Sequence, residues 1–136
     1  MSSYLSFYIV PKDKDIKTLN LMSYSRNTHI YRYFSEVVNP VYIGMGDEPE
    51  YTELTVQKVD EVIEDMKEDI NKYQRQISEY EKHAGGNTDI IEYILELKEE
   101  LDILEQALHK VEFIRDIVYE ASCSWNNYNK VLCNVD

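Results

Sequence analysis

The sequence predicts a mainly helical α+β protein, in which a long antiparallel coiled-coil helical hairpin carries a small head. Two stretches place apolar residues at heptad spacing, and a Gly-Gly pair separates them. The start of the chain instead alternates apolar and polar residues, as strands do. We expect helices at about 53–83 and 88–122. Residues 1–51 and the C-terminal tail would supply short strands and one short helix.

This arrangement predicts one domain over residues 1–136, a common size for a single domain. Residues 1–51 and 123–136 would form the head, and residues 52–122 the hairpin. Gly and Pro number only four and three, so little of the chain has the composition of a linker.

The head begins with the stretch SYLSFYIV, which predicts a strand with one buried face. Leu5, Phe7 and Ile9 fall on that face, and the residues between them are Ser or Tyr. A polar turn, PKDKD, follows, and TLNLMSY is expected to return as a second strand.

The next stretch, SRNTHIYRYFSEVV, predicts a short helix capped by Ser25, with Ile30, Phe34 and Val37 facing inward. We expect a third strand at NPVYIG and a loop at MGDEPEY. Near the C-terminus NKVLCNV alternates weakly, and this pattern predicts an edge strand.

The first long helix carries an apolar seam with intervening residues that are nearly all polar, a pattern typical of a coiled coil. Thr52 or Thr55 is expected to cap its N-terminus. Gly85 and Gly86 are expected to end it, because glycine adopts the left-handed cap conformation without steric cost. The seam positions are Val56, Val59, Ile63, Met66, Ile70, Tyr73, Ile77 and Tyr80.

The second helix, started by Asn87 or Thr88, repeats the pattern, and a connection of about five residues requires the helices to be antiparallel. One register then layers the two seams throughout. Its layers are Tyr80–Ile94, Ile77–Leu97, Tyr73–Leu101, Ile70–Leu104, Met66–Leu108, Ile63–Val111, Val59–Arg115 and Val56–Val118.

The second helix has more apolar residues than one seam needs. One set is expected to bury against the head: Ile103, Ala107, Ile114, Ile117 and Ala121. A second set, Ile91 and Leu95 with Tyr93 close by, lies near the tip of the hairpin. These side chains are either scattered surface residues or a contact for another chain.

Arg115 occupies a seam position, where an unpaired guanidinium would be costly to bury. We expect it to reach Asp60 or Glu112 at the edge of the seam, and a role in setting register or partner stays open.

The other candidate interaction group lies in the predicted short helix and consists of Tyr31, Arg32 and Tyr33. Their tyrosines either cover the sheet or, with the arginine, contact a protein or a nucleotide.

The charge is concentrated in the hairpin. The formal net charge is −12, and residues 51–122 hold nineteen acids and eight bases. Such a field repels phosphate backbones and anionic lipid and suits a basic partner, so we expect neither direct nucleic-acid binding nor membrane association. The chain lacks an apolar run of membrane-spanning length and a recognisable secretory signal. A cytoplasmic location, in a bacterium or a phage-infected cell, is the expectation, with Cys123 and Cys133 as free thiols.

No residue pattern points to chemistry, and we expect no enzyme activity, no catalytic residues, no cofactor and no metal. The histidines are scattered, and the paired carboxylates occupy outer positions of the predicted coiled coil, where water surrounds them. The stretch Gly44 to Gly46 lacks the Lys-Ser/Thr of a phosphate-binding loop.

The leading functional hypothesis is therefore a non-enzymatic interaction or assembly protein. It would act through a self-associating acidic hairpin and a tyrosine-rich head, as a homodimer or larger homo-oligomer. One alternative is a phage-type inhibitor that imitates nucleic acid or sequesters a basic protein. Another is a protein that sequesters a small molecule or nucleotide in a pocket between head and hairpin.

Overall fold

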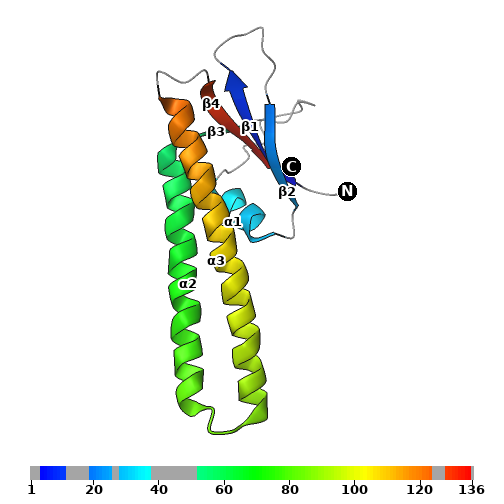
Figure 1. Cartoon of the computed structure of the whole chain (residues 1–136), viewed down its shortest axis with the longest axis vertical. Helices are drawn as coiled ribbons and strands as arrows, with labels where there is room; N and C mark the ends of the chain where they lie inside the picture. The colour runs from blue at the N-terminus through cyan, green and yellow to red at the C-terminus, as the bar shows by residue number, and fades with distance from the viewer. Residues whose placement is uncertain (1–3, 12–18, 26–27, 38–51, 124–127, 136) are drawn as a thin grey trace.

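The protein has the predicted architecture: a four-stranded antiparallel sheet and a short helix pack on one end of a long antiparallel helical hairpin (Figure 1). The computed structural model describes residues 4–11, 19–25, 28–37, 52–123 and 128–135. The predicted strand NPVYIG and loop MGDEPEY lie outside these residues.

Seven elements follow one another along the described chain. They are β1 (Tyr4–Pro11), β2 (Leu19–Ser25), α1 (His29–Val37), β3 (Thr52–Leu54), α2 (Val56–His83), α3 (Thr88–Ser122) and β4 (Tyr128–Val135). Leu5 and Phe7 are buried on the inner face of β1, as the alternation predicts, and Ile30 and Phe34 face inward from α1. The side chains of Ile9 and Val37 fall outside the description.

The sheet has the strand order β2-β1-β4-β3. The prediction that NKVLCNV forms an edge strand is wrong, because β4 lies between β1 and β3 and pairs with both. Val131 and Cys133 of β4 are buried. A strand in the middle of a sheet has hydrogen-bonded neighbours on both sides, so its position depends on strands distant in sequence, which local alternation does not report.

The hairpin helices start and end at the residues that capping chemistry favours. Thr55, not Thr52, caps α2 through the amide of Lys58, because residues 52–54 pair with β4 as β3. Gly85 and Gly86 have φ of 49° and 86°, values that other residues rarely adopt. Asn87 accepts hydrogen bonds from the first amides of α3.

The short helix starts later than predicted. Ser25 is the last residue of β2, and the side chain of Thr28 caps α1 instead by accepting from the amide of Tyr31. Both serine and threonine are good cap residues, so the sequence alone could not place the start between them.

One hydrophobic core joins the sheet, α1 and the upper part of the hairpin. Its fully buried side chains include Leu5, Phe7, Phe34, Val59, Val62, Met66, Leu104, Val111, Val131 and Cys133. A second, smaller cluster of Ile77, Ile94 and Leu97 lies farther down the hairpin. The lower hairpin thus has far fewer buried side chains than the upper part.

The extra apolar stripe of α3 buries against the head only in part. Ala107, Ile114 and Ala121 are buried and Ile117 packs on the core, but Ile103 is 50% exposed. The prediction for Ile103 is therefore wrong. It lies one turn below Ala107 along α3, and the head does not cover it there.

Substituting the buried aromatic of α1 tests whether the head is held by the shared core. Phe34→Ala should lower the free energy of unfolding by about 3–5 kcal/mol, because Phe34 is 0% exposed and its removal leaves a cavity. Phe113→Ala is the matched control, since Phe113 is 59% exposed on α3. Urea denaturation measures both, and an equal loss at the two positions would contradict this core.

Candidate functional site

The structure separates the candidate interaction residues into three places. Tyr31, Arg32 and Tyr33 lie on α1, Arg115 lies in the upper hairpin, and Ile91, Tyr93 and Leu95 lie near its tip. Among the described residues, no group of three His, Cys, Asp or Glu side chains could hold a metal ion. None of the described helices has an apolar stretch that could span a membrane.

Tyr33 faces into the protein, with only 3% of its surface exposed. Its hydroxyl donates a hydrogen bond to the carboxylate of Asp69 on α2. Burial and this bond raise the pKa of Tyr33 to about 12, because both favour the neutral phenol. Tyr33 therefore fixes α1 to the hairpin.

Arg32 and Tyr31 are more accessible than Tyr33. The guanidinium carbon of Arg32 lies 5.0 Å from the centre of the Tyr33 ring, within the range of a cation–π contact. Tyr31 is partly buried against the core. Of the three side chains, only Arg32 is exposed, so α1 offers one cation rather than an aromatic platform.

Arg115 binds Asp60, one of the two carboxylates that the sequence proposes. Its Nε donates to Asp60 Oδ1 at 2.5 Å, across the seam between α3 and α2. Asp60 raises the pKa of the guanidinium. Both side chains are partly exposed, so the charge reaches the edge of the seam and is not buried.

The contacts at the two ends of the hairpin agree with the predicted register. The pair Arg115–Asp60 lies next to the predicted layer Val59–Arg115. Near the tip, the rings of Tyr80 and Tyr93 meet edge to face at 5.1 Å, next to the layer Tyr80–Ile94.

Tyr93 and the pair Ile91 and Leu95 lie on different sides of α3. Two residues along a helix correspond to about 200° of rotation, so Tyr93 points away from both. It contacts Tyr80, whereas Ile91 and Leu95 are 42% and 56% exposed. The sequence proximity of the three residues thus does not make one patch.

Ile91 and Leu95 belong to the face of the hairpin opposite α1. Glu100 lies 3.9 Å from His29 of α1, which marks the side of α3 that faces the head. Ile91 precedes Glu100 by nine residues, or about two and a half turns, and so lies on the opposite side. We call Ile91 and Leu95 the distal apolar pair.

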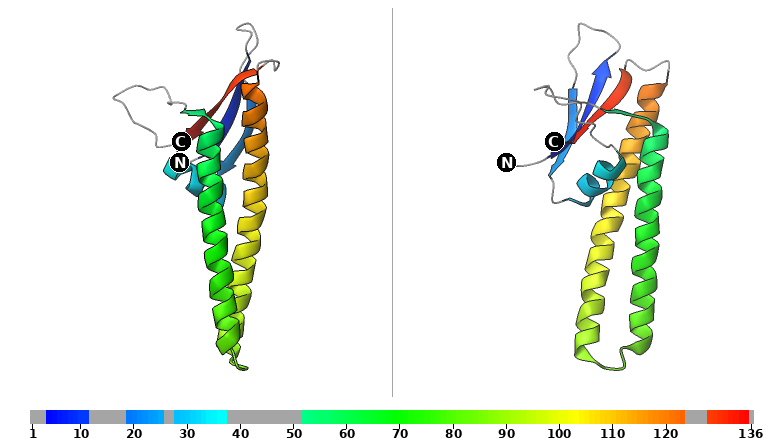
Figure 2. Two further views of the ribbon diagram at one scale, coloured as in Figure 1. Left: turned by 90° about the vertical axis from the view of Figure 1, so that its left-hand side faces the viewer. Right: turned by 180° about the vertical axis from the view of Figure 1, so that it is seen from behind.

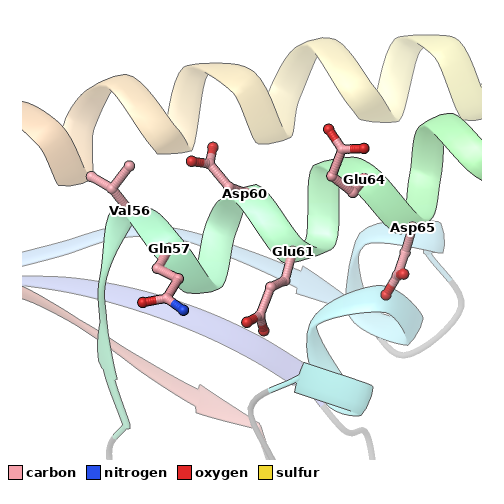
Figure 3. Close-up of a pocket in the computed structure, with 6 residues that line it drawn as sticks. All are labelled: Val56, Gln57, Asp60, Glu61, Glu64 and Asp65. Atoms are coloured by element: carbon pink, nitrogen blue, oxygen red, sulfur yellow. The ribbon is translucent and has the colours of Figure 1, made fainter.

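An acidic hollow lies on the upper part of α2 (Figure 3). Asp60, Glu61, Glu64 and Asp65 line it together with Val56 and Gln57. Asp60 and Glu64 project on the side of α2 nearer α3, and Glu61 and Asp65 on the other side. The carboxylates of Glu61, Glu64 and Asp65 are exposed to water, as solvated outer positions of a helical hairpin normally are.

The buried thiol of Cys133 does not have the character of a nucleophile. Burial raises the pKa of Cys133 to about 12, so the reactive thiolate is suppressed at neutral pH.

Comparisons with protein-family models, with curated proteins and with solved structures find no match. The sequence indicates the distal apolar pair, because the second helix has more apolar residues than one seam needs. It does not indicate Asp69 as the partner of Tyr33, because that contact joins residues 36 positions apart.

Removing the hydroxyl of Tyr33 should change both stability and its pH dependence. Tyr33→Phe should lower the free energy of unfolding at pH 7 by roughly 1–2 kcal/mol through loss of the bond to Asp69. The folded pKa of about 12 exceeds the ordinary tyrosine pKa of 10.0, so the contribution of Tyr33 to stability is full below pH 10 and falls as pH rises toward 12.

Urea unfolding of both proteins at pH 7, 9 and 11 measures this difference. Cys133 titrates equally in both, so the gap between them isolates Tyr33. The gap should narrow as pH rises above 10, and a constant gap would refute the assignment.

Replacing Arg115 tests whether its ion pair stabilises the hairpin. Arg115→Leu should leave the urea midpoint unchanged or slightly higher, because exposed ion pairs contribute little and leucine completes the apolar seam. Val111→Ala, one turn away and fully buried, is the control that should lower the midpoint. A large loss in Arg115→Leu would instead assign the guanidinium a structural role.

Proposed function

We propose that this chain is a non-enzymatic interaction protein that assembles through the distal half of its helical hairpin. The observation that carries the proposal is the distal apolar pair on a part of the hairpin that extends beyond the sheet and α1 (Figure 1). Burying these two side chains would remove apolar surface from water, which favours association.

The position of the pair supports an interface better than a second contact within the chain. Both views of Figure 2 show that the head packs on the upper hairpin and leaves the tip projecting. The distal half is held by only three buried side chains, Ile77, Ile94 and Leu97, with partly buried residues around them. An added chain on this segment would enlarge a thin core.

Imitation of nucleic acid is the second candidate, and the acidic hollow on α2 supports it through charge alone. A partner held that way would dissociate steeply as salt rises, because exposed charges are screened. An apolar contact would persist in high salt. The third expectation, a small-molecule pocket between head and hairpin, stays a prediction. The three hollows described here, all lined by hairpin residues, do not test it.

The solution mass tests the proposed function. The wild-type chain should have a mass above its 16.1 kDa protomer at both low and high salt in light scattering after size exclusion. Ile91→Lys with Leu95→Lys should shift it to a monomer, because two ammonium groups would have to be buried.

Phe113→Lys with Tyr119→Lys is the matched control. It removes two exposed apolar side chains of the upper part of α3 and should leave the mass unchanged. A wild-type monomer, or an unchanged mass in the distal variant, would reject the proposed function.

A further inference from the structure

The hairpin face that carries the distal apolar pair also carries a hollow on the neighbouring helix. The hollow is shallow and open to solvent, and four polar residues of α2 line it: Asn71, Gln74, Arg75 and Ser78. These residues are spaced i, i+3, i+4 and i+7. In knobs-into-holes packing, four residues at this spacing surround a side chain inserted from a neighbouring helix.

The hollow lies on the side away from the head. Asp69 of α2 accepts a hydrogen bond from Tyr33 of α1, so it marks the side of α2 that faces the head. Ser78 follows Asp69 by nine residues, about two and a half turns. Ser78 therefore lies opposite Asp69 around α2, just as Ile91 lies opposite Glu100 around α3. The protruding pair and the hollow share one face of the hairpin.

The two helices carry complementary charges beside these features. Residues 71–83 of α2 hold three bases and two acids, whereas residues 88–102 of α3 hold six acids and one base. On α2, Arg75 and Lys82 are seven residues apart, and on α3, Glu92 and Glu99 are seven apart. Seven residues span about 10.5 Å along a helix, so the two pairs match in spacing.

Within the described residues, Arg75, Lys82, Glu92 and Glu99 have no ion-pair partner. Neighbouring charges are used inside the chain, as in Lys98–Glu81 at 3.0 Å and Lys72–Glu68 at 3.6 Å. Two bases on one helix and two acids on the other thus remain available to another molecule.

The charged residues of α2 and α3 also lie at matching heights along the hairpin axis. Tyr80 contacts Tyr93, and Ile77 packs with Leu97 and Ile94. At this register Leu95 is level with Ser78 and Glu79. Glu92 is then level with Lys82, and Glu99 with Arg75.

We propose that the occupant of this face is a second copy of the chain, with α3 of each copy lying on α2 of the other. This inference rests on the proposed function and names its partner. A twofold axis parallel to the hairpin keeps the copies level and makes every contact twice. Each Leu95 then enters the Ser78 end of the other copy's hollow, and each Glu92–Glu99 pair meets the other copy's Lys82 and Arg75.

The heads permit this arrangement, because they cover the opposite face of each hairpin and stay on the outside of the dimer. The product is a four-helix arrangement of the two distal halves. With two apolar side chains from each copy, we expect a dissociation constant on the order of 10 μM, weaker than large obligate dimers.

Complementary charge reversal tests the pairing. Arg75→Glu with Lys82→Glu should weaken dimerisation at least tenfold, because acids would then face acids. Glu92→Lys with Glu99→Lys should weaken it similarly, although that variant carries less net negative charge and would repel its own copies less. An equimolar mixture of the two monomeric variants should form a heterodimer, since both of its contacts again join opposite charges.

Sedimentation equilibrium of each variant and of the mixture, from about 2 to 200 μM in 0.15 M salt, measures these constants. Glu61→Lys with Glu68→Lys is the matched control, with the same charge change at the same seven-residue spacing on upper α2. Its dissociation constant should stay within about twofold of wild type.

The outcomes separate this inference from the proposed function. If the distal Lys variant dissociates but the two charge variants keep wild-type affinity, the distal interface stands and the α2–α3 pairing is overturned. Failure of the mixture to associate, with both variants monomeric, also overturns the pairing. A monomeric wild type overturns both the pairing and the proposed function.

Discussion

The apolar seam between α2 and α3 is the interaction on which the rest of this structure depends. The inner face of the sheet, with Leu5, Phe7 and Cys133, packs against α1 and the upper hairpin. Phe7 and Phe34 meet edge to face at 5.1 Å, and Val62, Met66 and Leu104 belong to the same buried cluster. A sheet of four strands gains its stability from such packing. The head therefore requires the hairpin to be formed.

The same seam explains why the molecule is uneven along its length. Its upper half both joins the helices and supports the head, and most of its apolar side chains are buried. The lower half joins the helices alone, and few of its side chains are buried. Regions with few buried contacts open at lower free energy than the rest of a protein. Partner binding at the lower half would offset that weakness without disturbing the head.

Heptad spacing allowed the hairpin to be predicted closely, because residues seven positions apart lie on the same side of a helix and face the same neighbouring helix. It led to both helices, the turn at Gly85 and Gly86, and a register that the contacts of Arg115 and Tyr80 fit. It also identified Ile91 and Leu95 as surplus. Features that depend on distant parts of the chain escaped: the central place of β4, the bond of Tyr33 to Asp69, and the exposure of Ile103. The place of β4 depends on strands distant in sequence, and the other two features depend on where the head lies along the hairpin. No local sequence pattern contains either kind of information.

The central position of β4 has a consequence for the order in which the protein can form. β1 pairs with residues 128–135, more than a hundred positions later, and among the described strands β3 pairs with β4 alone. Contacts at such separation form slowly, whereas α2 and α3 meet across a short turn. During synthesis the hairpin can fold as soon as it leaves the ribosome. The sheet has to wait for β4, and β1 and β2 spend that interval as an unfinished pair whose edge a chaperone or a neighbouring chain could occupy.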